Sequence, residues 1–579
     1  MPIIWLAVVL LPISGKGHSL PDKSALYEAH TLVDAMKRAE QLKLAQTPAF
    51  KRLLHYDGTE SLVDKDSPFF LACDGFKNPQ AELSATLQAF YDKMPLDDRH
   101  AICRFPARFS YLTEQLNLPR SDFPMPDCAR YKEFRQKVPA QSVSLVFAGE
   151  SNLSPSSMMG HLFLKFSGFE NREIHAVQKE HQNDVPDKQF NGVTNTESYA
   201  QLCGEQTDSH KGRPTEYALS FFASFSEQST AAFYVKALAG NVDGFYILSP
   251  YRKKVSEYVF TEERPLWEFE MALNDKQKEQ LMNHIWELKE KKVKYAFISN
   301  NCGKASVDLL QVANPQWGAS QKPFQTPLGH IQNLSGQGAV QNITLVPSDA
   351  YALKMKQNPK NPLKAAGTSR VSVYWRHLNG SFVGASFMPV YRDIIDPEPA
   401  YHDALETKIM TINAAYRPAD GNFFIDGIDV MKLKSIINAS QSFAFSKDFK
   451  FSLENDLGDD TTRLRPTAEG GLGVGYEILN GVTPYILPKI GYRYNKFHNF
   501  YLTPEIGVIV NATEQLRLTA SFAPYLNTKA QNRGYDSKFG ASAAYRFYEN
   551  YTFFTHFNAY GDTDIRRKRE LITGVAVSF

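Results

Sequence analysis

At 579 residues the chain is long enough for two to four domains of ordinary size. Its 64 Lys and Arg residues balance its 62 Asp and Glu residues, so the charge indicates neither a nucleic acid nor another strongly charged partner. Aromatic residues make up 13% of the chain, and Tyr and Phe crowd its last third, which is a first indication of a membrane barrel with aromatic girdles.

The N-terminus has the pattern of an export signal over residues 1–19. Ile3 to Ile13 form an apolar run that is short for a bilayer span, and Gly17 and Ser19 place small residues before a cut ahead of Leu20. No Lys or Arg precedes the run, so a retained anchor is the alternative. No later segment is long and apolar enough to predict a transmembrane helix.

Residues 20–137 are expected to form a helical module. Leu26 to Leu44 repeats apolar residues at helical spacing, and Asn78 followed by Pro79 predicts a capped helix start. The stretch from Cys103 to Arg108 is expected to end the module in turns, and the carboxylates at helical spacing are expected on solvated faces. No catalytic constellation stands out here, so packing or substrate presentation is the expected role.

The five cysteines of an exported chain suggest disulfides. Cys103 and Cys128 are close in sequence and are expected to pair across a short loop, and Cys73 and Cys203 are candidates for a second bridge. These two pairs would leave Cys302 as the free thiol.

Beyond residue 138 the pattern changes to strands. Val143 to Ala148 is an apolar run, and after a polar loop a second strand begins at Gly160-His161. The alternation of this strand places His161 at its start, on the face opposite the aliphatic side chains. Such a histidine is either a half-exposed polar residue or a base that takes the proton of a nucleophile, and Gly160 permits close backbone approach beside it.

The most informative stretch runs from Tyr295 to Leu310. Its aromatic and apolar start breaks at Asn300-Asn301 and gives way to helical spacing, so Asn301 is the expected N-cap and Cys302 the first helical residue. Unpaired N–H groups and the helix dipole at this position favour a thiolate and are expected to lower the pKa of the thiol. Papain-like thiol enzymes present their nucleophile in this way. The alternative is that Cys302 is only a small hydrophobic residue buried at the start of a helix.

Three stretches together resemble one family. Residues 160–166 (Gly-His-Leu-Phe-Leu-Lys-Phe), 264–269 (Arg-Pro-Leu-Trp-Glu-Phe) and 295–302 (Tyr-Ala-Phe-Ile-Ser-Asn-Asn-Cys) are similar to the DUF4105 family. The periplasmic domain of that family is shared with the bacterial lipoprotein N-acyltransferase Lnb, and it is related to circularly permuted thiol enzymes of the NlpC/P60 and lecithin–retinol acyltransferase type. The resemblance covers residues 138–345 and implies that Cys302 is the nucleophile and His161 the base.

The same resemblance suggests Ser220 as the third polar residue, which would orient the imidazole, at a strand position where the family often carries Asn. The implied chemistry needs no cofactor and no metal. The chain departs from the acyltransferase relatives after this domain, because those continue into transmembrane helices and this chain does not.

After a linker-like stretch at 346–368 the period of the apolar residues becomes two. Strands of membrane-spanning length are expected at 370–377, 380–390, 464–477, 482–495, 499–510, 514–525, 537–547, 550–560 and 571–579. We therefore expect residues 369–579 to form an antiparallel outer-membrane barrel of about ten to twelve strands. A soluble β-sandwich is the alternative.

The details of this region agree with a barrel of a Gram-negative outer membrane. Short turns such as Asn480-Gly481 separate several strands, and the charged insertions at 456–465 and 527–538 are expected to be the longer outer loops. The last strand alternates toward the terminal Phe579, which resembles the signal read by the barrel assembly machinery. The domain that carries Cys302 is then expected to face the periplasm.

Two functions from different classes fit these patterns. In the first, the barrel anchors a periplasmic thiol enzyme that forms an acyl-thioester and transfers or hydrolyses acyl groups of lipids or lipoproteins. An NlpC/P60-like peptidoglycan amidase is the enzymatic alternative. In the second, the barrel is a pore or port and the periplasmic domain is an inactive adaptor.

The enzymatic interpretation makes two geometric predictions. The sulfur of Cys302 and a ring nitrogen of His161 should lie roughly 3 to 4.5 Å apart. An acyl substrate would also require a groove beside Cys302 that is lined by apolar side chains and open toward the membrane.

The expected fold is α+β with several domains. Its parts are a signal peptide at 1–19, a helical module at 20–137, a permuted papain-like domain at 138–345, a linker at 346–368 and a transmembrane β-barrel at 369–579.

Overall fold

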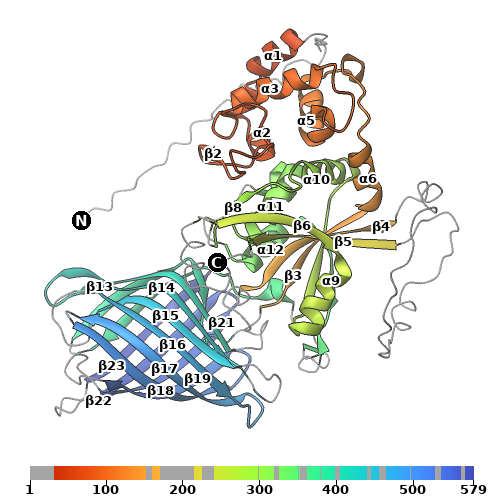
Figure 1. Cartoon of the computed structure of the whole chain (residues 1–579). Coiled ribbons are helices and arrows are strands. Elements are labelled where there is room, and N and C mark those ends of the chain that lie inside the picture. The colour runs from red at the N-terminus through yellow and green to blue at the C-terminus, as the bar shows by residue number, and fades with distance from the viewer. Residues whose placement is uncertain are drawn as a thin grey trace, which may run out of the picture.

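The computed structural model has three parts, a helical module, a sheet domain and a barrel (Figure 1). It describes residues 32–150, 159–169, 214–224, 240, 242–297, 299–318, 325–349, 351–352, 361–378, 380–397, 404–437, 439, 445–455, 464–495, 497–527, 536–561 and 568–579. The expected signal peptide at 1–19 lies outside these residues. Within the described part of the chain, no helix combines the length and the apolar character needed to cross a membrane.

The helical module confirms the helix start predicted at Asn78-Pro79, and α1 (Leu32–Gln41) confirms part of the predicted stretch 26–44, of which residues 26–31 lie outside the described residues. Asn78 caps α3, because its Oδ1 accepts the N–H of Ala81 at 3.1 Å, and Pro79 occupies the first turn. The elements are α1 (Leu32–Gln41), η1 (Leu44–Gln46), α2 (Pro48–Leu53), β1 (Tyr56–Asp57), β2 (Glu60–Ser61), α3 (Pro79–Tyr91), α4 (Ala101–Arg104), α5 (Pro106–Leu116), η2 (Arg120–Asp122) and α6 (Ala129–Lys137).

Two expectations for this module are wrong. The stretch from Cys103 to Arg108 lies in α4 and α5 rather than in turns, because Pro106 starts a new helix immediately after α4 ends. Glu82 is not on a solvated face but is fully buried, where the guanidinium of Arg108 lies 2.7 Å away and the N–H groups of Leu71 and Ala72 donate to the carboxylate. Buried charges of this kind persist only when they are paired and hydrogen-bonded.

The sheet domain is an antiparallel seven-stranded sheet in the order β8-β6-β5-β4-β3-β7-β9 with helices on both faces. Its elements are β3 (Ser142–Ala148), β4 (His161–Phe169), β5 (Pro214–Ala223), β6 (Val242–Pro250), α9 (Tyr251–Val255), the π-helix η6 (Ser256–Thr261), β7 (Leu266–Met271), α10 (Asp275–Glu287), β8 (Val293–Tyr295), α11 (Cys302–Ala313), η7 (Pro315–Gly318), α12 (Pro327–Gly336) and β9 (Val340–Val346).

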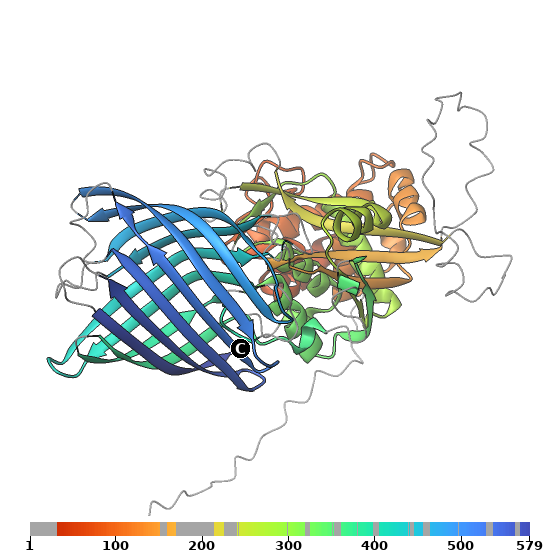
Figure 2. The same cartoon turned by 90° about the horizontal axis from the view of Figure 1, so that it is seen from below.

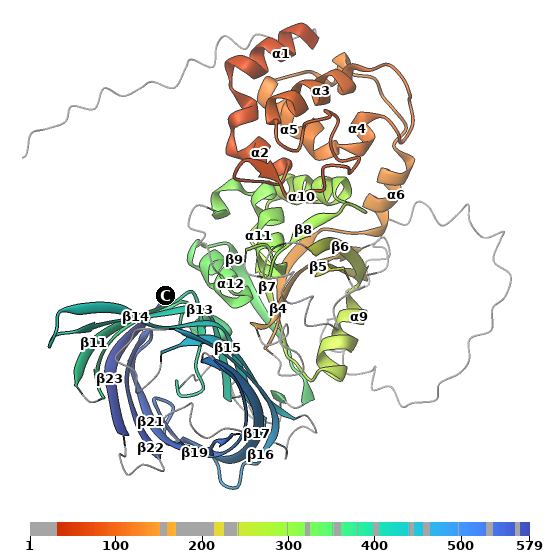
Figure 3. The same ribbon diagram turned by 60° about the vertical axis from the view of Figure 1, so that its left-hand side comes forward.

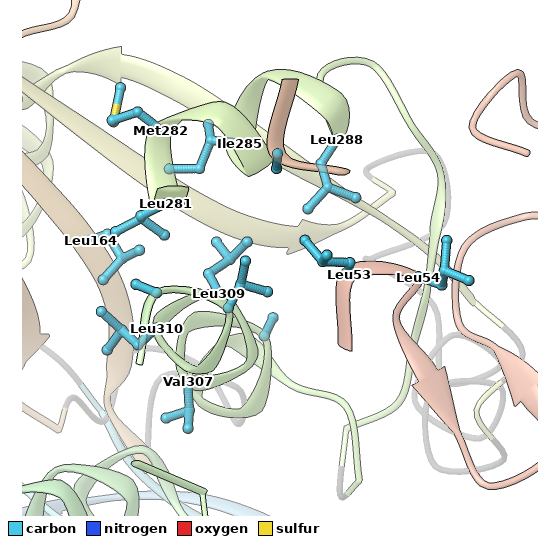
Figure 4. Close-up of a cluster of buried hydrophobic side chains, with 14 of the residues drawn as sticks. Leu53, Leu54, Leu164, Leu281, Met282, Ile285, Leu288, Val307, Leu309 and Leu310 are labelled. Carbon is cyan, nitrogen blue, oxygen red and sulfur yellow. The ribbon is translucent and has the colours of Figure 1, made fainter. Parts of the chain in front are cut away.

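The two faces of this sheet have different cores. Alternate residues of β4, such as Leu164, pack with Leu281 of α10 and Leu310 of α11 in a large cluster that continues into the helical module (Figure 4). The other residues of β4, such as Phe163, pack with Tyr251 and with Tyr258 of η6 in a smaller cluster. Helix α9 lies on the side of the sheet away from α10 and α11 (Figure 3). Because successive side chains of a strand point to opposite faces, the alternation seen in the sequence determines this layering.

The C-terminal third is a closed antiparallel barrel. Its strands are β10 (Arg370–His377), β11 (Ser381–Met388), β12 (Val390–Arg392), β13 (Ala404–Arg417), β14 (Asn422–Ile436), β15 (Ser446–Glu454), β16 (Arg465–Gly475), β17 (Val482–Asn495), β18 (Phe497–Asn511), β19 (Leu516–Pro524), β20 (Leu526–Asn527), β21 (Ser537–Tyr548), β22 (Tyr551–Gly561) and β23 (Lys568–Ser578), after a short η8 (Pro362–Lys364).

Pairing of β10 with β23 and of β11 with β13 closes the ring. Since β12 continues β11 and β20 continues β19, the ring has 12 strands, within the expected range. The end that carries the C-terminus faces the sheet domain (Figure 2). Phe579 is fixed there by mutual backbone hydrogen bonds with Ser369.

The exterior of the barrel is apolar and has aromatic residues near both ends. Exposed side chains on the outer wall include Val373, Ile412, Ile486 and Ile506. Exposed aromatics near the end that faces the sheet domain are Tyr476, Phe547, Tyr548 and Tyr551, and those near the far end are Tyr416, Phe423, Tyr494 and Phe500. An apolar band between aromatic girdles is the surface that a bilayer requires.

The interior of the barrel is polar and is narrowed by a turn. After β12 the chain folds inward, so that Ile394 and Ile395 pack with lumen aromatics such as Tyr485. Arg370 pairs with Asp396, which also accepts a hydrogen bond from Tyr391 at 2.6 Å. Further along the lumen, Lys434 and Lys489 bind Glu505 at 2.6 and 2.8 Å, and Arg376 binds Glu570 at 2.6 Å. These networks line the lumen with paired charges.

The sequence pattern missed three of the strands, β13, β14 and β15. Register shifts at Asn413/Ala414 and Asp429/Met431 interrupt their alternation, and Met410 has a left-handed backbone conformation with φ of 56°. Because a bulge adds one residue to a strand, it moves the apolar pattern to the other face and erases the period of two.

Candidate functional site

Helix α11 begins as the sequence predicts, with Asn301 as its N-cap. The Oδ1 atom of Asn301 accepts the N–H groups of Gly303 at 3.0 Å and Lys304 at 3.2 Å, and its Nδ2 donates to the carbonyl of Phe297 at 3.2 Å. Cys302 is therefore the first residue of the helix, held by a side chain that ties the helix start to the segment before it.

Burial changes the expected electrostatics of the thiol. Cys302 is only 8% exposed, and burial raises the pKa of its thiol. The N–H groups of Leu162, Gly303 and Cys302 itself, together with the charge of Arg264, act in the opposite direction but do not overcome it. The expectation of a lowered pKa is wrong, because the helix start is shielded from water and desolvation disfavours the thiolate.

His161 begins β4 and lies among aromatic rings. Its imidazole stacks on Phe222 of β5, with ring centroids 5.0 Å apart, and lies 6.0 Å from the ring of Tyr258. Burial, with the nearby charges of Arg264 and Lys254, lowers the pKa of His161 to about 3. Its Nε2 is buried and has no hydrogen-bond partner in the described part of the chain. The ring is therefore neutral at physiological pH.

The thiol and the imidazole converge on the first two residues of β4. The N–H of Leu162, the residue after His161, donates to the sulfur of Cys302. Helix α11 packs on the face of β4 that carries Leu162, whereas the ring of His161 lies on the opposite face. The structure brings the two residues to the same strand end, and the distance of roughly 3 to 4.5 Å between sulfur and ring nitrogen stays a prediction.

Ser220 lies on the same face of the sheet as His161. It pairs in register with Phe163, two residues beyond His161, and its side chain is fully buried. Its Oγ has no hydrogen-bond partner among the residues that the structure describes. A buried hydroxyl without a partner is costly, so it is available to a ring nitrogen or to a ligand. Its assignment as the third polar residue stays a prediction.

The structure adds two residues that the sequence analysis did not select. Arg264 is 3% exposed, donates to the carbonyls of Gly149 and Ala148 at 2.5 and 3.1 Å, and its charge acts on both Cys302 and His161. Tyr258 lies between this guanidinium, 4.9 Å from its ring, and the imidazole. The only signal for Arg264 was its place in the 264–269 stretch, and Tyr258 belongs to a helical turn that the pattern did not identify.

The remaining cysteines lie apart from this site. Cys103 and Cys128 form a disulfide within the helical module, with Cα atoms 5.1 Å apart. Cys73 is exposed. Its proposed partner Cys203 lies outside the described residues. Cys302 is not in a disulfide, which leaves its thiol available for chemistry.

Two surfaces near the site are apolar. A groove of about 490 Å³ is lined by residues that include Leu219, Phe222, Tyr246 and Ile285, and it shares Phe222 with the surroundings of His161. Cys302 is not among the described residues that line it. The predicted groove beside the thiol therefore stays a prediction.

The second apolar surface is the contact between the rim of the site and the barrel. Met159 precedes Gly160-His161, Ala223 follows Phe222, and Phe297 precedes the Cys302 helix. All three pack on Val390 and Ile409 of the barrel in one buried cluster. Tyr391 and Lys408 point into the lumen, so Val390 and Ile409, their neighbours in the paired strands, face outward.

Comparisons with known proteins match the three parts separately. Residues 130–196 and 200–336 match the model of the Lnb N-terminal periplasmic domain. Residues 42–115 and 359–561 match two domains of unknown function, DUF7843 and DUF7840. No curated protein matches the chain.

Several solved structures of outer-membrane proteins resemble about a third of this chain. The KdgM porin is 11% identical, with a TM-score of 0.23, and the match covers 36% of this chain and 99% of the porin. The NanC porin is 7% identical, with a TM-score of 0.25, over 36% of this chain and 100% of the porin. Omp33 of Acinetobacter baumannii is 10% identical, with a TM-score of 0.21, over 37% of this chain and 99% of Omp33.

The chain is an outer-membrane protein with a periplasmic domain. The closed ring of strands and its apolar exterior are the features of a membrane-spanning barrel. The match of the sheet domain to a family of periplasmic domains determines the side of the membrane on which that domain lies.

Proposed function

We propose that the protein is a membrane-anchored thiol enzyme that takes acyl groups from lipids or lipoproteins through an acyl-thioester on Cys302. The DUF4105-type resemblance and the match to the Lnb periplasmic domain support this assignment. So do the thiol that opens α11 and the neutral imidazole that begins β4.

The observation that carries the proposal is the position of the site against the outer wall of the barrel. Val390 and Ile409 are buried under the rim of the site, and their neighbours along the wall, Phe387, Met410 and Ile412, are 44%, 41% and 40% exposed. These neighbours belong to the apolar band, so the rim of the thiol site lies at the edge of the bilayer. A substrate anchored in the leaflet can reach this rim without leaving the membrane.

The chemistry follows from the protonation states. The thiol of Cys302 and the imidazole of His161 are both neutral at rest, because burial disfavours both ions. His161 takes the thiol proton as the sulfur attacks an ester carbonyl, and it returns this proton to the departing alkoxide when the thioester forms. An amine or a water molecule then attacks the thioester, and the thiol is regenerated. The N–H groups of Leu162 and Cys302, which donate to the sulfur, are candidate donors for the developing oxyanion.

An acyl chain also suits the apolar surroundings. Each methylene that leaves water contributes about 0.8 kcal/mol to binding. The groove that shares Phe222 with the histidine is lined mainly by apolar side chains. A peptidoglycan amidase would instead need a polar cleft with donors for sugars and stem peptides.

The port alternative has less support. The lumen is crossed by paired charges, and the turn with Ile394 and Ile395 folds into it. If the barrel is an anchor, the purified protein should show no stepwise conductance in planar bilayers. Large single-channel steps would favour the port.

The test of the proposed function is a search for the covalent intermediate. The purified full-length protein is incubated with phospholipid or diacylated lipoprotein, and the peptide that contains Cys302 is analysed by mass spectrometry. We expect an added acyl mass that disappears in Cys302→Ala and falls strongly in His161→Gln. Absence of any adduct together with cleavage of muropeptides would replace acyl transfer by amidase activity.

A further inference from the structure

The outer wall of the barrel contacts each of the three segments that carry the candidate catalytic residues. The contact side chains are Met159 beside His161, Ala223 beside Phe222, and Phe297 before the Cys302 helix. Among the described residues, the barrel contributes Val390 and Ile409 to this buried cluster, and these two pair directly across β12 and β13. The paired strands β12 and β13 of the barrel thus share one buried cluster with residues next to β4, at the end of β5 and before α11.

A charged contact joins the same two parts beside this apolar one. Arg392, two residues after Val390 and on the same outer face, forms an ion pair with Glu150. The side chains of Arg392 and Glu150 are 15% and 12% exposed, so the pair is largely removed from water. Glu150 directly follows Gly149, whose carbonyl accepts a hydrogen bond from Arg264 at 2.5 Å.

This ion pair extends to the candidate site through Arg264. The guanidinium of Arg264 holds the carbonyls of Ala148 and Gly149 at the end of β3, and Ala148 pairs in register with His161. The same guanidinium acts electrostatically on Cys302 and on His161. A displacement of Glu150 would therefore alter the electrostatic effect of Arg264 on both Cys302 and His161.

A small cavity confirms that the two parts form a common surface. A space of about 60 Å³ is lined by Glu150 and Met159 from the sheet domain and by Val390, Arg392 and Thr407 from the barrel.

We propose that the barrel is one wall of the thiol site, with Arg392 as a positioning residue that holds the His161 strand end through Glu150, and Val390 and Ile409 as the cover that keeps water from Cys302. This inference rests on the proposed function only in taking Cys302 as the reactive group. It assigns the barrel a part in the reactivity of the thiol, beyond that of an anchor.

The test uses the rate of alkylation of Cys302 by iodoacetamide, which needs no acyl substrate. Full-length protein in detergent is treated over a range of pH, and the labelled peptide is quantified by mass spectrometry, so that the exposed Cys73 does not interfere. The variants are Arg392→Glu, Glu150→Arg, their combination, and Ile409→Ala.

Each single charge reversal should loosen the cover, admit water and relieve part of the desolvation of the thiol. We expect the midpoint of the alkylation profile to fall by about one pH unit and the rate at pH 7 to rise about tenfold. The combined variant restores opposite charges at the same two positions, so it should return toward the wild-type profile. Ile409→Ala should shift the profile in the same direction as the single reversals.

The control is Lys276→Glu, which reverses one partner of the exposed surface pair with Glu114. It should leave the profile unchanged. Heat-modifiable migration in gels verifies that each variant still has a folded barrel.

If the folded single variants alkylate with the wild-type rate and midpoint, the barrel is only an anchor and the inference is wrong. Absence of an acyl adduct with shifted alkylation would instead refute the proposed function and leave this inference standing.

Discussion

Two buried histidines of the sheet domain have almost the same protonation behaviour and different surroundings. Burial lowers the pKa of His161 to about 3 and the pKa of His284 to about 3. His284 is part of α10 and faces the helical module, where its Nε2 is 2.9 Å from Nε2 of His55 and the two rings stack. The Nε2 of His161 has no such partner within the described residues.

The difference lies in what each ring can still bind. Around His284, a continuous chain of groups runs through Glu287 and Arg108 to Glu82, with Arg108 2.7 Å from Glu82 and 3.5 Å from Glu287. This network joins two parts of the protein and occupies the Nε2 atom of His284, although His284 Nδ1, Glu287 Oε2 and Arg108 Nε have no hydrogen-bond partner among the described residues. At the thiol site, His161 and Ser220 keep buried polar atoms that no described residue satisfies. A lowered pKa and a buried ring nitrogen without a partner are common to both histidines, so the neighbouring thiol of Cys302 is what points to function at His161.

The sharpest test of this comparison replaces each histidine by Gln. His161→Gln should slow formation of the acyl adduct on Cys302 by about 10²–10⁴-fold, the range for loss of a general base. His284→Gln, the matched control, should leave the chemistry nearly unchanged and lower the stability by about 1–3 kcal/mol, because it disturbs the bond to His55. Adduct formation is followed by mass spectrometry. Equal losses of activity in both variants would remove the distinction between the two sites.

The next effect concerns the stability of the buried network. Arg108→Met should destabilise the protein by about 3–5 kcal/mol, because Glu82 and Glu287 would remain buried without their cation. Chemical unfolding followed by tryptophan fluorescence measures this loss, since Trp286 lies in α10 beside the network. The matched variant Lys276→Met, at an exposed pair, should cost less than about 1 kcal/mol. A small effect of Arg108→Met would show that water or a rearrangement compensates the carboxylates.

A third prediction uses the pH dependence of the same network. Burial raises the pKa of Glu287 from 4.5 to about 7, so the stability that its proton gives is complete below pH 4.5 and is lost as the pH rises through 7. His55 and His284 act in the opposite sense, because their pKa values are lowered and their contribution is lost as the pH falls below 6.5.

Glu287→Gln should therefore raise Tm more at pH 8 than at pH 5. An amide keeps an acceptor for the N–H of Arg108, which lies 2.9 Å from the carboxylate, and carries no charge to lose or gain. Thermal unfolding followed by tryptophan fluorescence at the two pH values is the measurement. An equal gain at both pH values would contradict the raised pKa.

The smallest expected effect is that of Ser220→Ala. If Ser220 only orients the imidazole, its loss should slow adduct formation by less than about tenfold, as for one neutral hydrogen bond. Ser220→Asn tests an amide side chain at the same position. A loss as large as that of His161→Gln would instead give the hydroxyl a direct part in the reaction.

Much of the architecture follows from local patterns. The alternation around Leu162 and Leu164 predicts which face of β4 is aliphatic, and Asn301 predicts where α11 begins. Both depend on residues adjacent in the chain, so propensity and capping decide them. The period of two likewise predicts most barrel strands. It fails at β13, β14 and β15, whose pairings contain register shifts.

The sequence by itself determined the positions of Cys302 and His161 at the starts of a helix and a strand, and the barrel as the C-terminal part. Only the tertiary structure decided the environment of these groups. Burial of Cys302 raises its pKa against the helix dipole, Glu82 is buried beside Arg108, and Val390 and Ile409 cover the rim of the site. The physical reason is that desolvation and cross-domain contacts depend on residues distant in the chain, and no local pattern encodes which distant residue excludes water from a given side chain.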